Sequence, residues 1–344
     1  MSVIIDVKGV NSDNLSMKHI VILAGDTVMT SQLVGVMDFF MICNKYWQIR
    51  TRDPKVQLFK VTVASPDGSD LTSESGVTIP ASFAPDLARV DTIIVTAGVA
   101  YDKPTLGRYY ERVRAFSQYL HEANVRQVPI GGFCSATFVL AQMGLLKDRK
   151  ATTVWWLADL FRQSFPATKV ELKQLVVRDG NLFTAGASTS YLSLCLSMLE
   201  HLYDAQIANQ VAKIMLVDPN RNSQLPYMSL QTPESHKDDL VHSIQHWMYK
   251  NLSRHISLDD ISERFAITKR TLNRRFKKAL DDTPVNYLQR MRVEEAKKLL
   301  ESSDMTVESI VYQVGYEDVS SFRKLFTEIA EVTPKAYREK FQAC

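Results

Sequence analysis

The most cationic stretch of the chain is residues 264–278, which hold seven Lys or Arg residues and no acidic residue. Leu272, Phe276 and Leu280 recur at every fourth position, so a helix there buries one apolar stripe. The opposite side of the helix then presents Arg, Lys and Asn side chains. Arg pairs with guanine, Asn pairs with adenine, and Lys neutralises phosphates. The stretch therefore has the chemistry of a helix that reads the DNA major groove, although a basic run alone is more often a solvated helix face.

The same pattern returns fifty residues later, which favours the DNA-reading interpretation. Leu272-x3-Phe276-x6-Thr283-Pro284-x2-Tyr287 is matched by Phe322-x3-Phe326-x6-Thr333-Pro334-x2-Tyr337. Each copy predicts a helix, a tight turn, a second helix and a Thr-Pro start for a further helix. Between the copies, residues 285–301 contain no Gly or Pro and predict a rigid connecting helix. We therefore expect two helix-turn-helix units that enter major-groove segments about 34 Å apart.

Two sets of side chains lie on the faces of the second helices opposite the apolar stripes. The DNA-binding candidates are Lys269, Arg270, Asn273, Arg274 and Lys277 in the first copy, and Val319, Ser320, Arg323 and Lys324 in the second. Thr268 can cap the first of these helices and Asp318 the second. Because Glu317 and Asp318 repel phosphate, we expect the second helix to be the weaker reader.

The second copy also reads Ile310-x3-Val314-Gly315-Tyr316-x-Asp318-x-Ser320-x-Phe322-x-Lys324-x-Phe326, followed by Thr333-Pro334-x2-Tyr337-Arg338. On these motifs, residues 237–344 resemble the DNA-binding domain of the AraC/XylS family of bacterial transcription regulators. The resemblance implies that Arg270, Asn273 and Arg274 read bases, while Lys269 and Lys277 hold phosphates.

Two details of this region bear on backbone geometry. Gly315 falls where the turn needs a positive φ. The family usually has Gly before each Thr-Pro, where this chain has Asp281 and Glu331. Because Asp tolerates the left-handed conformation better than Glu, we expect the two helices to end differently.

Residues 18–217 predict an α/β domain. Apolar strand patterns (19–24, 56–64, 91–98, 128–134) alternate with helical ones (35–44, 106–124, 135–146). This alternation is typical of a mainly parallel sheet with helices on both faces, whose ligands bind at the carboxyl ends of the strands. One such end holds Cys134, where a strand runs straight into a helix. The junction fits a nucleophile elbow whose helix dipole lowers the thiol pKa, and it fits a packed cysteine equally well.

Further motifs are spread over the same domain: Gly132-Phe-Cys134, Leu140-Ala141-x2-Gly144-Leu145-Leu146, Ala151-Thr152-Thr153-x-Trp155, Asp179-Gly180-x3-Thr184-Ala185-Gly186 and Arg221-x2-Gln224. Together they resemble the flavodoxin-like DJ-1/PfpI (class I glutamine-amidotransferase-like) superfamily, in the GlxA-type branch that precedes an AraC-type domain. The resemblance implies a ligand pocket, with Gln32, Cys134, Ser135, Val154 and Trp155 as its candidates.

Departures from that family bear on catalysis. Val154 stands where members commonly have a His that could act as a base, Gln32 replaces an acidic residue, and Ala136 replaces a Gly. A thiolate without a base or an acid is a poor hydrolytic catalyst. We therefore expect no catalytic residue and no enzyme activity, but a sensor of a small metabolite. The alternatives are an active Cys-dependent hydrolase or glyoxalase-like enzyme fused to a DNA-binding module, and a ligand-free architectural DNA binder.

Composition sets the remaining expectations. The net charge of the 344 residues is only +3, so DNA affinity has to come from a local patch. Four scattered Cys residues without a C-x-x-C pair favour a reducing cytoplasm over disulfides or zinc, and the pair His242 and His246 alone does not predict a metal. No stretch predicts a signal peptide or a membrane span.

The domain boundaries follow from these patterns. We expect a mobile tail over residues 1–17, the sensing domain over 18–217, an extended Pro-containing linker over 218–236, and the DNA-binding domain over 237–344. The expected partners are promoter DNA and a small effector and, as the resemblance implies, RNA polymerase and a second copy of the chain. The branch suggests an amino-acid or quaternary-ammonium derivative as effector; no cofactor is expected.

Overall fold

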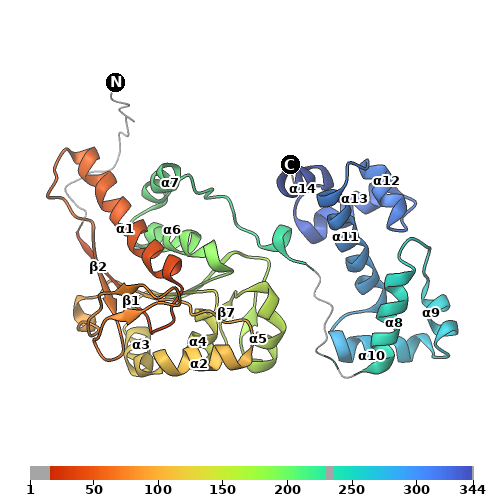
Figure 1. The fold of residues 1–344 in the computed structure, drawn as a ribbon, viewed down its shortest axis with the longest axis horizontal. Helices are drawn as coiled ribbons and strands as arrows, with labels where there is room; N and C mark the ends of the chain where they lie inside the picture. The colour runs from red at the N-terminus through yellow and green to blue at the C-terminus, as the bar shows by residue number, and fades with distance from the viewer. Residues whose placement is uncertain (1–15, 230–235, 237, 343–344) are drawn as a thin grey trace. The chain divides into compact units, whose positions relative to one another are not determined.

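The structure, a computed structural model, describes residues 16–229, 236 and 238–342, so the tail expected over 1–17 lies almost wholly outside the described residues. The chain divides into two compact domains between Gln224 and Leu225 (Figure 1). Each domain is described by itself. In the described ranges, no helix combines the length and the apolar character needed to cross a bilayer.

The amino-terminal domain is built on a six-stranded sheet with the strand order β2-β1-β5-β6-β10-β9. The strands are β1 (Lys18–Leu23), β2 (Phe59–Ala64), β5 (Thr92–Val95), β6 (Ile130–Phe133), β9 (Val176–Asp179) and β10 (Leu182–Ala185). All neighbours pair in parallel except β9 and β10. Most positions of the parallel strands are buried, as their apolar runs predict, and the mainly parallel sheet is confirmed.

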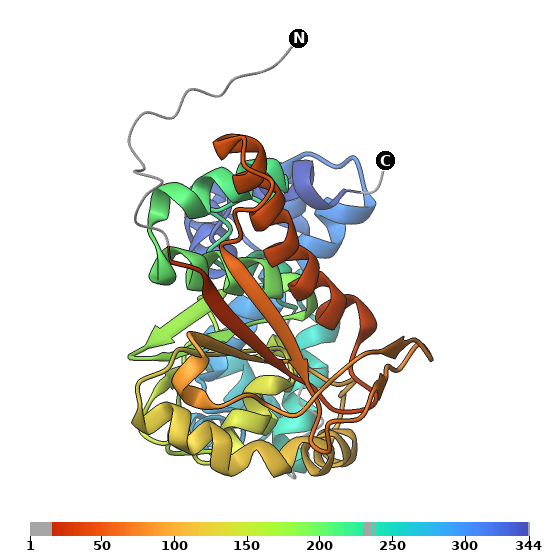
Figure 2. The ribbon, with the colours of Figure 1, turned by 90° about the vertical axis from the view of Figure 1, so that its left-hand side faces the viewer.

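Helices cover both faces of this sheet. They are α1 (Thr30–Thr51), α2 (Lys103–Val113), α3 (Ser117–Val125), α4 (Ala136–Gln142), α5 (Ala158–Ser164), α6 (Tyr191–Leu202) and α7 (Ala205–Ile214). Figures 1 and 2 show α1, α6 and α7 on one face and α2, α3 and α4 on the other. Two short strand pairs complete the domain: β3 (Leu71–Thr72) with β4 (Thr78–Ile79), and β7 (Lys150–Ala151) with β8 (Lys169–Val170).

Several helix boundaries differ from the sequence patterns. The helix expected over 106–124 is two helices, separated by the 3-10 turn η3 (Arg114–Phe116), which buries Phe116. The helix expected over 135–146 ends at Gln142, because Gly144 takes a φ of +79° and its amide bonds back to Ala141.

The carboxyl-terminal domain is helical and contains both expected helix-turn-helix units. Its helices are α8 (Asp239–Lys250), α9 (Leu258–Arg264), α10 (Lys269–Leu280), α11 (Pro284–Ser302), α12 (Val307–Gln313), α13 (Val319–Ala330) and α14 (Pro334–Phe341). The first unit uses α9 and α10, the second α12 and α13, and α11 is the connecting helix. Gly315 has a φ of +82°, as the turn between α12 and α13 requires.

The ends of α10 and α13 correct one expectation. Asp281 and Glu331 both adopt the left-handed conformation, with φ of 52° and 55°. Each amide donates to the carbonyl four residues earlier, so the two helices end in the same way. In both helices, the carbonyls of the last turn need a hydrogen-bond donor, which the left-handed residue supplies. This requirement outweighs the lower tolerance of Glu for the left-handed conformation.

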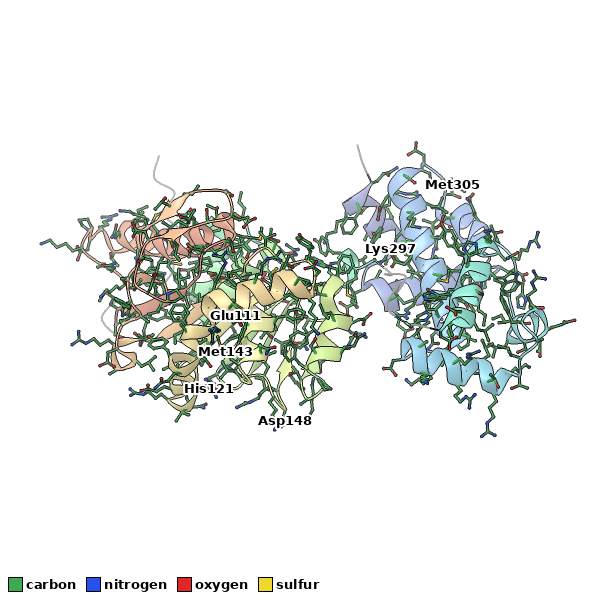
Figure 3. The ribbon with its side chains drawn as sticks, turned by 60° about the horizontal axis from the view of Figure 1, so that its bottom comes forward. Glu111, His121, Met143, Asp148, Lys297 and Met305 are labelled. Carbon is green, nitrogen blue, oxygen red and sulfur yellow. The ribbon has the colours of Figure 1, made fainter. Side chains whose placement is uncertain are left out.

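The stretch expected to be an extended linker is partly folded. Asn222 accepts a hydrogen bond from the Leu175 amide within the amino-terminal domain. Leu225–Tyr227 forms the 3-10 turn η6, in which Pro226 is buried. The Met228 carbonyl accepts a bond of 2.8 Å from Lys297 Nζ of α11 (Lys297 is labelled in Figure 3). Only 3% of Lys297 is exposed, so this chain segment supplies an acceptor that its buried ammonium needs.

Candidate functional site

Helix α10 carries the first candidate DNA-binding face. The Thr268 hydroxyl accepts the Thr271 amide at 3.2 Å, which is the predicted cap. Leu272 and Phe276 are fully buried in the core of the first helix-turn-helix unit. Burial of this stripe turns Arg270 and Arg274 into solvent, where both are exposed. The geometry therefore presents two guanidinium groups on one outward helix face.

The polar contacts of α10 separate its cations into two kinds. Lys269 pairs with Asp259 and Lys277 with Asp281, each at 2.7 Å, while Asn273 donates to the Lys269 carbonyl at 2.9 Å. Arg270 and Arg274 form no ion pair with any residue that the structure describes. Exposed pairs are weak, so DNA phosphates can replace the two carboxylates, but the arginines need no such exchange.

Helix α13 carries the second candidate face. Asp318 caps it by accepting the amides of Ser320 at 2.9 Å and Ser321 at 3.2 Å. Ser320, Arg323 and Lys324 are exposed and line a shallow surface groove of about 460 Å³, together with Thr327 and Glu328, which sequence reasoning did not select. Arg323 is paired with Glu308 of α12. Val319 is only half-exposed, because it packs against the core of the second unit.

Cys134 lies at the turn between β6 and α4. Its φ is +55°, which is uncommon for a residue other than Gly, and its amide donates to the Ala185 and Gly186 carbonyls at 3.1 and 2.8 Å. The sharp strand-to-helix turn is therefore present. Burial raises the pKa of the Cys134 thiol to about 11, against the opposing effect of hydrogen bonds with Ser135 and Gln32. Of the two interpretations that the sequence left open, the raised pKa favours the packed cysteine over the low-pKa thiol, because burial outweighs the positive end of a seven-residue helix.

The residues around Cys134 form a closed polar cluster. Gln32 is fully buried and donates to the Ser188 hydroxyl at 2.9 Å, and its other side-chain atom, Oε1, is buried without a partner among the described residues. The Ser135 hydroxyl donates to the Gly98 carbonyl at 2.8 Å. The Thr153 hydroxyl donates to the Cys134 carbonyl, and the buried Val154 follows it. Trp155 is half-exposed and contacts Trp156.

Two open cavities lie at the carboxyl edge of the sheet, beside this cluster. One of about 220 Å³ is lined by residues that include Tyr101, Arg108 and Arg112, and one of about 410 Å³ by residues that include Met29 and Val34. Glu74 and Val99 line both. None of the five pocket candidates is among their lining residues. Glu74 comes from the β3–β4 hairpin, which no motif marks, so sequence reasoning had no signal for it.

In the described part of the chain, no group of three His, Cys, Asp or Glu residues is placed to hold a metal ion. His242 Nε2 instead lies 2.8 Å from the His236 carbonyl, and its ring stacks on the His236 ring.

Comparison with known proteins agrees with both parts of the geometry. The model of the DJ-1/PfpI family matches residues 18–201, and that of a helix-turn-helix domain matches 261–340. The HTH-type transcriptional regulator CdhR of Pseudomonas aeruginosa is 27% identical over 82% of this chain and 82% of its own length. GbdR of the same species and GlxA of Rhizobium meliloti, also HTH-type transcriptional regulators, are each 22% identical over 82% of this chain and 76% and 86% of theirs. Both resemblances read from the motifs are confirmed.

Proposed function

We propose that the amino-terminal domain of this chain senses a small metabolite without catalysing a reaction. The chain belongs to the DJ-1/PfpI family and carries an AraC-type helix-turn-helix domain, so it is a DNA-binding transcription regulator. The observation that carries the proposal is the state of Cys134. A thiol with a pKa of about 11 is almost entirely protonated at neutral pH. Val154 beside it cannot accept a proton, and the Gln32 amide does not ionise. Binding needs only shape and polar partners, which the two cavities lined by Glu74 and Val99 offer.

The effector site proposed here is the pair of cavities that share Glu74. Glu74 is an exposed carboxylate, and Arg108 and Arg112 line the smaller cavity with it. A ligand with an ammonium group and a carboxylate complements these charges, which suits the amino-acid or quaternary-ammonium derivative that the resemblance implies. The larger cavity offers Met29, Val34 and Val99 to methyl or methylene groups.

Promoter DNA is the second ligand. We assign base contacts to Arg270, Asn273 and Arg274, phosphate contacts to Lys269 and Lys277, and a supporting contact to Ser320, Arg323 and Lys324. A homodimer in the cytoplasm that recruits RNA polymerase completes the proposal. Effector binding would then change which arrangement of two protomers binds the promoter best.

Thermal-shift screening of the full-length protein against amino acids and quaternary ammonium compounds tests the sensing role. A true effector at 100 times its dissociation constant adds about 2.7 kcal/mol to the stability of the domain that binds it. Glu74→Gln should remove the shift. Glu111→Gln, a carboxylate of the same domain that pairs with Arg114 on the surface, should keep it.

Hydrolase and glyoxalase assays on the same preparation test the absence of catalysis. The expected result is no turnover that depends on Cys134. A rate of about 1 per second or more, lost in Cys134→Ala, would replace the sensor with the alternative, an active Cys-dependent enzyme fused to a DNA-binding module.

A further inference from the structure

The two helix-turn-helix units do not share one hydrophobic core. Among the described residues, α11 contributes Tyr287, Leu288 and Met291 to the core of the first unit, and Val293, Ala296 and Leu300 to that of the second. Arg292 lies between these two sets in the sequence of α11. Because both units pack on α11, the angle between them depends on this helix and on the contacts that cross it from one unit to the other.

Arg292 makes such contacts with both units at once. It is 8% exposed, and its Nη2 donates to the Arg254 carbonyl, in the α8–α9 loop of the first unit, at 2.6 Å. Its guanidinium lies over the ring of Tyr316, in the turn of the second unit, 5.2 Å from the ring centre. One side chain therefore joins a loop of the first unit to the turn of the second.

The backbones of the two units also approach each other beside this side chain. A Cβ atom added at Gly315 would lie 2.2 Å from the Leu252 carbonyl oxygen and 2.9 Å from Arg292 Nη2. Leu252 belongs to the first unit and Gly315 to the second. Only a residue without a side chain lets the two backbones approach so closely. The turn that contains Gly315 is therefore also a contact surface between the two units.

The chemistry of arginine suits this position. Its planar guanidinium can donate along its edge while an aromatic ring covers its face, which an ammonium cannot do with the same geometry. Burial of a cation is unfavourable unless its donors are satisfied. Arg292 Nε is buried without a hydrogen-bond partner among the described residues, so the bond from Nη2 and the contact with the Tyr316 ring are what favour this arrangement of loop, helix and turn. Burial also lowers the pKa of Arg292.

We propose that Arg292 is a positioning residue that fixes the angle between α10 and α13, so that both recognition helices bind one DNA molecule together. It acts without contacting DNA. The proposal concerns the DNA-binding activity itself and is independent of the effector.

The test compares a whole site with half a site. A site is first selected from random DNA with the full-length protein, and footprinting defines the parts that the two units protect. The affinity is then measured for this DNA and for DNA in which the part bound by the second unit is randomised. Two linked contacts add roughly 100-fold when their geometry fits, so the wild type should lose about that factor on randomisation. Arg292→Met should lose only a few-fold, with unchanged affinity for the half site.

Arg290→Met is the matched control. Arg290 stands on the same helix but pairs at 2.6 Å with Asp282, on the first unit's side of α11, so its loss should leave the ratio of the two affinities at the wild-type value. Arg292→Lys keeps the charge without the planar group and should behave as Arg292→Met does. If Arg292→Met does not fold, Arg292→Lys and Tyr316→Leu decide the question. A wild-type ratio in folded variants, or an equal loss on both DNAs, would refute the positioning role.

Discussion

At the scale of single residues, the two kinds of cation on α10 predict different effects on DNA binding. Arg274 is exposed and unpaired among the described residues, whereas Lys277 already has Asp281 as a partner. We expect Arg274→Ala to cost about 1–3 kcal/mol at the specific site and to relax sequence preference. Lys277→Ala should weaken specific and random DNA alike and reduce the salt slope by about 1. Salt titrations on both DNAs measure this, and an equal loss for Arg274→Ala would make Arg274 a phosphate contact.

The Cys134 thiol predicts a pH dependence of its reactivity. Burial raises its pKa from the ordinary value of 9.0 to about 11, so the thiolate fraction at neutral pH falls about 100-fold. Iodoacetamide should therefore label Cys134 in the native protein about 100-fold more slowly than in the urea-unfolded protein, as peptide mass spectrometry can measure. The folded state favours the neutral thiol, so its contribution to stability is complete below pH 9 and is lost as the pH rises towards 11. Fast labelling of the native protein at pH 7 would contradict the buried-thiol interpretation.

The sequence predicted the place of Cys134 but not its chemistry. The local pattern of an apolar strand, Cys and a helix is enough to indicate the turn. The pKa depends on how completely Cys134 is covered and on a hydrogen bond with Gln32, which is far away in the sequence. The local sequence does not show how deeply distant residues will bury the thiol. The sequence therefore indicated that the helix lowers the pKa of Cys134, but not that burial raises it by more.

At the scale of elements, the left-handed ends of α10 and α13 predict that Gly is stabilising there. A residue other than Gly in this conformation costs roughly 1–2 kcal/mol. Glu331→Gly should therefore raise the free energy of unfolding by about 1 kcal/mol, since the φ of 55° remains accessible. Asp281→Gly should gain less, because Asp tolerates this conformation and its carboxylate pairs with Lys277 at 2.7 Å.

Calorimetry on the two single variants measures this difference. A Gly also loses more entropy on folding, which reduces the gain at both sites equally, so the order of the two variants is the sharper test. A larger gain for Asp281→Gly than for Glu331→Gly would show that strain at the helix end is not what separates them.

Elements whose stabilising residues lie within their own sequence could be predicted, whereas elements that depend on a partner strand could not. Helices α10 and α13 have caps, apolar stripes and Thr-Pro signals within their own sequence, and their positions agreed with the pattern. The strands β3, β4, β7 and β8 are two residues long, and the local sequence of so short a strand cannot indicate its partner. The cavity residue Glu74 lies in the hairpin between β3 and β4, which is why the cavities could not be derived from motifs.

At the scale of the whole molecule, the two-domain organisation follows from the length of the chain and its motifs, but the point where the chain passes from one domain to the next does not. Three Pro residues and many polar ones made residues 218–236 resemble an extended linker. The structure shows that the part from Leu225 to Met228 packs on the carboxyl-terminal domain. One of its contacts is with Lys297, a buried cation that donates to the Met228 carbonyl as well as to Glu294, and the sequence around residue 228 gives no sign of it.

A fragment of residues 225–344 should therefore be more stable than one of residues 237–344. The shorter fragment loses the bond from Lys297 Nζ to the Met228 carbonyl, the buried Pro226, and the contact of the Tyr227 ring with Phe341 at 5.2 Å. After truncation, water can replace the Met228 carbonyl as a partner of Lys297. We therefore expect the loss of this bond to lower the free energy of unfolding by about 1–2 kcal/mol, which is closer to the value of a typical hydrogen bond than to that of one to a charged group.

Thermal melting of both fragments, each with and without Lys297→Met, measures the contribution of this bond as a double-mutant cycle. The truncation should cost less in the Lys297→Met background, because the Met228 carbonyl then has no ammonium to accept from. An equal cost in both backgrounds would assign the effect to Pro226 and Tyr227 alone. Equal melting temperatures of the two unmodified fragments would mean that residues 225–228 contribute nothing, and that the folding domain begins at 237, where composition placed it.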